Sequence, residues 1–440
     1  MKPRSLLAAT VLLAALSGVV WWAKKHPQAG TTPTTTTTSP KVVDIPSGDL
    51  EQIAIKKKNG SELVLDHASG QWQITQPEKL PADQDSVSTL TSALAPLTAD
   101  SVVDNNAADG PKYGLAAPSM TVTVARKGGK SDTIEFGDDA PAGSLVYLER
   151  LSDPKIYAVS TSTKTSFDKT VNDLRDKRLL TFNNDKLTSV EVDSKKGPIS
   201  FAKNNQGDWQ IVKPAAYRAD SFQVEELIRK LQDAKMDLSG SADDQKKAAA
   251  LFASGQPIAT VKTTDASGTE SLDIKKNKND YYAKSSVVTG IYKVSSDLGS
   301  GVDKTLDDFR NHKLFDFGFS DPTKIEFQNG SADSVYQKSG QDWKLNGKTM
   351  DAASIQTVID QLRDLSASAF PTEGFANPTL DITIVSNDGK RTEKVAFAKS
   401  RDKYIAKREN EPSLYEVSEK NVDDFVKAFN QIKPAPPTKK

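Results

Sequence analysis

The sequence predicts an α+β protein with three tandem repeats, each a mainly antiparallel sheet with two packed helices, plus an N-terminal transmembrane helix. Three observations predict this architecture. The chain has 440 residues, which corresponds to about three domains of ordinary size. An apolar run near the N-terminus has the length of a membrane span. Three sequence markers then recur in the same order at nearly the same spacing.

The apolar run from Leu6 to Ala23 predicts an uncleaved membrane anchor within residues 1–23. A helix over this run spans about 27 Å at about 1.5 Å per residue, close to the thickness of the hydrocarbon core. The run ends at Trp21 and Trp22, where an aromatic belt belongs. A cleaved signal peptide is the alternative, but no small-x-small site follows directly. We therefore expect a single-pass protein of the inner (cytoplasmic) membrane with its bulk in the periplasm.

Residues 24–41 are expected to form a linker. The stretch from Gly30 to Pro40 reads GTTPTTTTTSP and cannot bury apolar surface. Because prolines and β-branched threonines favour extended backbone, this linker would hold the following domains away from the bilayer. Residues 434–440 form another Pro/Lys-rich stretch, which we interpret as a tail.

The three markers are a tryptophan in a short β-like run, a tyrosine in a second such run, and a segment that follows each tyrosine. They begin at Trp72, Trp209 and Trp343, at Tyr157, Tyr292 and Tyr415, and at Thr170, Thr305 and Asn421. Independent markers that keep one order are the signature of an internal repeat. The sequence therefore predicts α+β repeats over residues 42–181, 182–316 and 317–433, the third being shorter.

Each repeat is predicted to open with a β-hairpin, because residues of alternating polarity surround an Asn-Gly pair at Asn59-Gly60 in the first copy. The tryptophan strand comes next and is followed by a helix. The helix prediction rests on an aspartate four residues before an apolar stripe of helical spacing, which is the position of an N-cap. These aspartates are Asp83, Asp220 and Asp351.

The second half of each repeat is predicted to contain a Gly- and Pro-containing turn, a strand, two shorter strands and a closing helix. This order differs from the alternating βαβ rhythm of a parallel sheet and favours an antiparallel α+β unit. A repeat of about 135 residues can bury its own core, so we expect three similar domains in a row.

Several of these segments together resemble a bacterial family known only as domain of unknown function 4340. The likeness lies in the tryptophan strand, the helix start Pro81-Ala82-Asp83, the YGL…P turn from Tyr113 to Pro118, and the run from Asp173 to Leu180. The third copy departs, because Val426 stands where the second has Arg310. The resemblance implies a membrane-anchored protein that faces the envelope. It also implies association with an ABC-type export system or a gliding-type auxiliary system.

Composition narrows the chemistry. The chain has no cysteine, so disulfides, thiolate metal sites and a cysteine nucleophile are excluded. Lysine plus arginine and aspartate plus glutamate both number 58, so no net charge attracts the chain to nucleic acid. We expect no nucleic-acid partner and no cofactor.

No catalytic or metal-binding motif stands out. The histidines His26, His67 and His312 share no metal-ligand spacing, and His312 falls in the predicted closing helix. The stretch from Asp104 to Gly110 has the composition of a calcium loop but the wrong register, so we interpret it as a polar turn. We expect no metal site.

The leading functional hypothesis is a non-enzymatic envelope module that binds or braces a protein partner, such as ABC-type transporter subunits. Two alternatives stay open. A glycan- or peptide-binding protein would expose its repeated tryptophans, whereas we expect them to be core anchors. A hydrolase that uses dispersed carboxylates would carry an acidic cleft in only one repeat. The cations of the run Arg175 to Arg178 are expected to cap a helix C-terminus.

Overall fold

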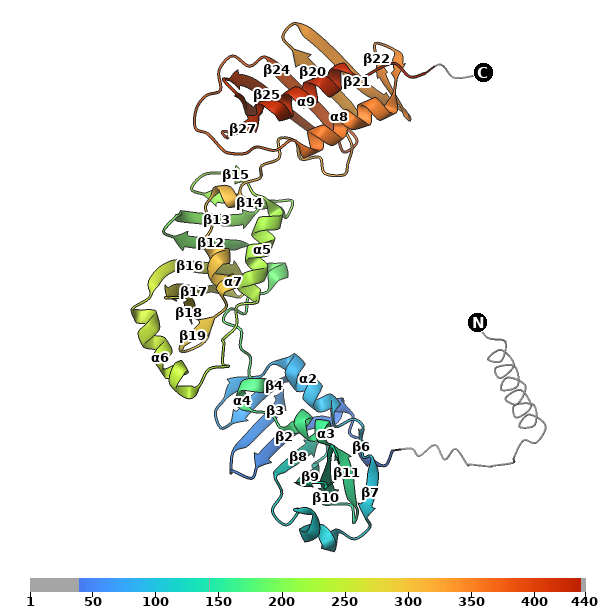
Figure 1. The fold of residues 1–440 in the computed structure, drawn as a ribbon, viewed down its shortest axis with the longest axis vertical. Coiled ribbons are helices and arrows are strands. Elements are labelled where there is room, and N and C mark those ends of the chain that lie inside the picture. Colours follow the sequence, from blue (N-terminus) through green and yellow to red (C-terminus); the bar gives the residue numbers. More distant parts are fainter. Residues whose placement is uncertain (1–38, 142, 437–440) are drawn as a thin grey trace, which may run out of the picture. The chain divides into compact units, whose positions relative to one another are not determined.

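A computed structural model describes residues 39–141 and 143–436 (Figure 1). The predicted anchor, nearly all of the predicted linker and the end of the predicted tail lie outside these residues. Within the described ranges, no helix combines the length and the apolar character needed to cross a membrane. The chain divides into two compact units, of which one ends at Asp176 and the other begins at Lys177.

The first unit contains a nine-stranded antiparallel sheet in the order β5-β4-β3-β2-β8-β9-β10-β11-β7. The first unit also contains a separate two-stranded antiparallel sheet, formed by β1 and β6. The bounds are β1 Lys41–Val43, β2 Leu50–Lys57, β3 Glu62–Ala68, β4 Gln71–Gln76, β5 Leu80–Pro81, β6 Leu97–Thr98, β7 Ser101–Asp104, β8 Met120–Arg126, β9 Lys130–Asp139, β10 Leu145–Arg150 and β11 Ile156–Ser160.

The second unit contains two eight-stranded antiparallel sheets, which we call the second and third sheets. The second sheet has the order β15-β14-β13-β12-β16-β17-β18-β19. Its strands are β12 Ser189–Ser194, β13 Gly197–Lys203, β14 Trp209–Lys213, β15 Tyr217–Arg218, β16 Gln256–Asp265, β17 Gly268–Asn277, β18 Asp280–Ser285 and β19 Ile291–Val294.

The third sheet has the order β23-β22-β21-β20-β24-β25-β26-β27. In each sheet the opening strand of the first hairpin lies at the centre and pairs with the first strand of the second half, so β2 pairs with β8, β12 with β16, and β20 with β24. The bounds in the third sheet are β20 Lys324–Asn329, β21 Ala332–Ser339, β22 Asp342–Leu345, β23 Lys348–Met350, β24 Leu380–Ser386, β25 Arg391–Ser400, β26 Lys403–Arg408 and β27 Leu414–Ser418.

Several sequence predictions are confirmed. Gly60 adopts a φ of 84° in the turn between β2 and β3, which only glycine reaches without strain, and the predicted hairpin forms there. Asp83, Asp220 and Asp351 are N-caps of the helices α2 Gln84–Ser92, α5 Ser221–Gln232 and α8 Ala352–Asp364. Each carboxylate accepts a backbone N–H three residues on, which satisfies a donor left free at the helix start.

The predicted closing helix is correct only near the third sheet, where α9 Glu419–Asn430 lies beside α8 on one face of the sheet (Figure 1). Elsewhere the marker run forms only α4 Val171–Leu174 and the 3₁₀ turn η4 Asp307–Phe309, while α3 Thr161–Phe167 and α7 Ser296–Val302 precede it. The run cannot continue as a helix because its next residues pair with a sheet edge. Ala82 pairs with Arg175, and Ala219 pairs with Arg310.

The helix α6 Ala242–Ala253 was not predicted from the sequence and lies against the second sheet at β18 and β19. The region between β7 and β8 in the first sheet holds a 3₁₀ helix instead, η2 Ala107–Tyr113. Two shorter 3₁₀ turns, η1 Ser47–Asp49 and η3 Asn184–Lys186, come just before the opening strands of the first and second sheets.

Each sheet has its own hydrophobic core, and each core includes a short segment that comes before its opening strand. These segments place nine buried residues in the cores, namely Val42, Val43 and Ile45, Leu179, Leu180 and Phe182, and Leu314, Phe315 and Phe317. The second and third cores therefore begin at Leu179 and Leu314, ahead of the predicted repeat starts at residues 182 and 317.

Candidate functional site

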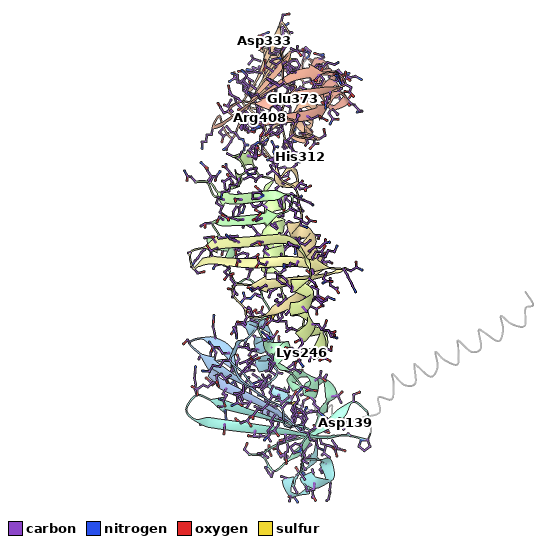
Figure 2. All side chains as sticks on the ribbon, turned by 90° about the vertical axis from the view of Figure 1, so that its left-hand side faces the viewer. Asp139, Lys246, His312, Asp333, Glu373 and Arg408 are labelled. Carbon is purple, nitrogen blue, oxygen red and sulfur yellow. The ribbon has the colours of Figure 1, made fainter. Side chains whose placement is uncertain are left out.

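An extensive polar cluster lies within the second unit, where side chains of the second and third sheets meet. We call it the junction. From the second sheet and its closing turn come Tyr217, Arg218 and Arg310. Facing them from the third sheet and its loops are Phe370, Glu393, Arg408, Glu411, Ser413 and Tyr415. His312 and Arg408, both labelled in Figure 2, belong to this junction.

Arg218, at the end of the edge strand β15, forms most of its contacts with the third sheet. Its Nε lies 3.0 Å from the Glu411 Oε1, and its Nη2 donates to the Tyr415 hydroxyl at 3.2 Å. The same nitrogen donates to the Lys313 carbonyl at 2.5 Å. The guanidinium also lies over the Tyr415 ring. A single arginine of one sheet thus holds a carboxylate and an aromatic residue of the next.

Arg310 lies between aromatic rings of the two sheets. Its guanidinium carbon is 4.3 Å from the ring centroid of Tyr217 and 3.6 Å from that of Phe370. Its Nη2 donates to the buried Ser413 hydroxyl at 2.9 Å. The planar guanidinium stacks on rings and still donates in its own plane, which a lysine ammonium cannot do.

Glu411 connects this contact to a buried pair in the third sheet. Arg408 donates to Glu411 through Nε at 2.7 Å and to Glu393 through Nη2 at 2.9 Å. Arg408 also donates to the backbone carbonyl of Leu314. Because the side chains of Glu393 and Arg408 are almost fully buried, an unpaired member would be costly.

The electrostatics follow from this pairing. Burial alone would raise the pKa of Glu411, but the positive charges of Arg218 and Arg408 outweigh it and lower that pKa below its ordinary value. Burial raises the pKa of the Tyr415 hydroxyl, which donates to Glu411 at 2.7 Å. Glu411 is therefore an ionised acceptor, so the cluster is suited to joining two sheets and not to proton transfer.

The repeated tryptophans occupy matching strands but differ in exposure. Trp209 in β14 is 7% exposed and Trp343 in β22 is 5% exposed, so both are core residues as expected. Trp72 in β4 is half-buried and stacks on His67, with ring centroids 4.9 Å apart. Buried indoles offer no stacking face to a ligand, which argues against the glycan-binding alternative at Trp209 and Trp343.

Other predicted positions fall in structural roles. His312 lies beyond η4, outside any helix, because the closing helix of this copy is shorter than predicted. Both of its ring nitrogens lie within 3.1 Å of backbone carbonyl oxygens. Asp104 accepts hydrogen bonds from the backbone of Asn106 and from the Tyr113 hydroxyl, consistent with a polar turn. Within residues 39–141 and 143–436, no group of three or more His, Asp or Glu side chains is arranged to hold a metal.

Of the predicted run, Arg175 is the C-cap residue of α4: its backbone N–H donates to the Val171 carbonyl, and its own backbone is extended, with a ψ of 147°. Arg310 follows η4 in the same way, and its side chain is buried in the junction. The backbone bridge between Met350 and Pro434 places Pro434, rather than Val426, at the position of Arg310 in the third sheet. Val426 instead packs against the core from α9.

Sequence reasoning missed Arg218, Glu411 and Phe370. One signal was available for Arg218. The first copy reads Leu80-Pro81 before its Ala-Asp helix start, whereas the second reads Tyr217-Arg218. An aromatic residue followed by an arginine, in place of a Leu-Pro pair, could have indicated a new contact.

The family comparison covers most of the chain. The sequence profile of the family described as "Domain of unknown function (DUF4340)" matches residues 72–208 and 209–381. The chain belongs to the DUF4340 family. The two DUF4340 matches begin at Trp72 and Trp209, inside the first and second cores, so their limits do not coincide with those of the sheets. No curated protein sequence and no solved structure matches this DUF4340 chain.

Proposed function

We propose that this DUF4340 chain is a non-enzymatic scaffold of the bacterial envelope, anchored in the inner membrane, that braces a protein partner. The observation that carries the proposal is the junction. Arg218 pairs with Glu411, and Arg310 is enclosed by Tyr217 and Phe370, so charged and aromatic contacts bind two sheets together. A brace needs its parts to keep a fixed spacing, and such a contact provides it.

Tandem repetition supports the same proposal. The three sheets share one strand order over their eight common strands, and each first long helix begins at an aspartate N-cap. We infer that they are three copies of one unit. A repeated unit extends reach without new chemistry, which suits a scaffold better than a single active site.

The location is part of the proposal. The apolar run from Leu6 to Ala23 would anchor the chain, and the Thr/Pro-rich linker would hold the sheets off the bilayer on the periplasmic side. The partner we propose is a protein of the same membrane, with subunits of an ABC-type transporter or a gliding-type complex as the first candidates.

Site-specific photocrosslinking in living cells tests the proposal. A photoreactive phenylalanine analogue would replace Phe319, Phe222 or Leu151, whose side chains are 100%, 70% and 60% exposed. We expect illumination to capture the same membrane protein reproducibly from at least one position. A chain whose residues 1–23 are replaced by a cleavable export signal is the control, and it should lose most of the capture.

Two outcomes would contradict the proposal. One is that no envelope protein is captured reproducibly from any of the three positions. The other is capture of cell-wall material alone, which would favour the glycan-binding alternative. Membrane fractionation of the native chain checks the anchor independently, because a soluble periplasmic chain would contradict that part of the proposal.

A further inference from the structure

The second sheet carries a cavity of about 320 Å³ at its β19 end, beneath the additional helix α6. The helix forms a small separate core with this end of the sheet, in which Ala248 and Phe252 pack against Tyr282. Ala248, Leu251 and Ile291 supply apolar wall to the cavity. A volume of this size lies at the lower end of the range of small-molecule sites.

The polar lining of the cavity is fixed by local hydrogen bonds. Asp244 and the N-cap residue Ser241 form a capping box at the start of α6. Asp237 accepts from the backbone and the hydroxyl of Ser239. Because these carboxylates are already positioned, a ligand would meet them in place and would not have to order them.

Tyr282 is the polar side chain for which the fold offers no partner. It is 6% exposed and lines the cavity, yet its hydroxyl forms no hydrogen bond with any described residue. The hydroxyl oxygen is open to the cavity and not sealed in the core, so a ligand could supply the partner that a largely buried tyrosine usually has. Burial, followed by the charge of Asp280, raises the pKa of this hydroxyl, so it remains a neutral donor and acceptor.

The three carboxylates and two ammonium groups of the cavity lining leave one net negative charge, which favours a cation. The lining includes the carboxylates of Asp237, Asp244 and Asp280 and the ammonium groups of Lys247 and Lys293. Lys293 Nζ lies 2.9 Å from Asp280 Oδ1, which neutralises that pair. Hydrogen bonds from Ser239 and Ser241 lower the pKa of Asp237 and Asp244, so both are ionised at neutral pH.

We propose that this cavity binds a small organic amine. The ammonium group would be held by Asp237 and Asp244, the Tyr282 hydroxyl would accept or donate a hydrogen bond, and the carbon frame would pack on Ala248 and Leu251. This proposal is independent of the scaffold function.

The second sheet alone has this arrangement among the described residues. Strand register shows which residues of the other sheets correspond to Tyr282. Ser285, Arg150 and Arg408 occupy matching positions in the three sheets. The residues three positions earlier, Tyr282, Tyr147 and Ile405, therefore correspond as well. In the first sheet the ring of Tyr113, from η2, packs on Tyr147 with centroids 4.8 Å apart, and in the third sheet Ile405 has no hydroxyl and no helix takes the place of α6. We therefore expect one amine per chain.

Ligand-observed NMR on the full chain in detergent, below neutral pH, tests the proposal with three matched pairs. They are cyclohexylamine with cyclohexanol, glucosamine with glucose, and 1,5-diaminopentane with 1,5-pentanediol. We expect at least one amine to bind while its hydroxyl analogue does not. Tyr282→Phe removes one hydrogen bond and should lower the affinity for the amine by about 2- to 12-fold. Tyr147→Phe is the matched control and should leave binding unchanged.

Three results would overturn the proposal. No amine of the series binds, an amine and its hydroxyl analogue bind equally, or Tyr282→Phe binds as tightly as the native chain. Asp237→Asn is a second variant, because it removes the charge and keeps the size of the side chain. Asp237→Asn should lower the affinity for the amine more than Tyr282→Phe does. An affinity equal to that of the native chain in this variant would contradict the proposed role of the carboxylate. Circular dichroism of each variant establishes that the fold is intact.

Discussion

Removing the charge of Glu411 tests whether the junction holds the second and third sheets together. Glu411 accepts from Arg218, Arg408 and Tyr415, at distances from 2.7 to 3.0 Å. Glu411→Gln keeps the shape of the side chain but leaves two arginines without their shared negative charge. Breaking a fully buried ion pair in this way costs about 3–5 kcal/mol.

The expected cost at this site is smaller, for two structural reasons. The Glu411 side chain is 20% exposed, so water partly compensates for the lost charge. Arg408 keeps its bond to Glu393 at 2.9 Å, so only Arg218 loses its principal carboxylate. We therefore expect Glu411→Gln to destabilise the junction by about 2 kcal/mol, which corresponds to about a 30-fold increase in the population of its open form.

Hydrogen exchange followed by mass spectrometry measures this opening locally. Amides that flank the junction on its two sides are Asn311, which donates to the Arg218 carbonyl next to Arg310, and Glu416, which donates to the Ala369 carbonyl next to Tyr415. Their exchange should accelerate by up to about 30-fold in Glu411→Gln, because exchange reports the free energy of local opening. Peptides over residues 145–160 of the first sheet serve as the internal reference.

Glu326→Gln is the matched control, since Glu326 forms an exposed pair with Lys324 and should contribute about 0.5 kcal/mol or less. The reasoning would be refuted if Glu411→Gln left both junction amides at the native rate, or if Glu326→Gln accelerated them equally. Combining Glu411→Gln with Arg218→Met gives a double-mutant cycle. A coupling near zero would show that the two side chains act independently across the junction.

The remaining predictions concern the single sheets. Asp351→Ala should lower the stability of the third sheet by about 1 kcal/mol in urea unfolding, whereas Asp351→Asn should retain it, because either side chain with an oxygen can cap α8. Trp343→Ala should cost about 3–5 kcal/mol, and the half-buried Trp72→Ala clearly less, by the same assay. Hydrogen bonds from Ser267 and the backbone lower the pKa of Asp265 to about 2 from 3.8. The contribution of the Asp265 carboxylate to the free energy of unfolding is therefore complete above its ordinary pKa and is lost as the pH falls toward 2. Asp265→Asn should flatten this part of a plot of the urea midpoint against pH.

Local chemistry made part of this fold predictable. The N-caps depend on one aspartate and the first turn of its helix, and the β2–β3 hairpin depends on Gly60. Such features are encoded within a few residues, so a single sequence suffices to find them. The marker tyrosines likewise lie in β11, β19 and β27, where short strands were predicted.

Features that depend on distant partners were not predictable in the same way. Helical propensity in TVNDLRDKRLL could not reveal that Arg175 would pair with the edge beside Ala82. The helix α6 was missed because its sequence, rich in alanine and charge, buries few side chains and shows little apolar periodicity. The contact of Arg218 with Glu411 joins residues 193 positions apart, and no local pattern reports such a distance.

The junction also shows how sheets with a common strand order differ in the contacts of their edges. Arg175 and Arg310 occupy the same position, since each pairs with the alanine before a helix N-cap. What differs is the preceding pair, Leu80-Pro81 in one sheet and Tyr217-Arg218 in the other. Tyr217 supplies a ring for Arg310, and Arg218 reaches Glu411, so the two residues of this edge strand contribute directly to the contact with the next sheet. The strand order is therefore common to the three sheets, whereas the side chains on their edges determine the contacts that each sheet makes.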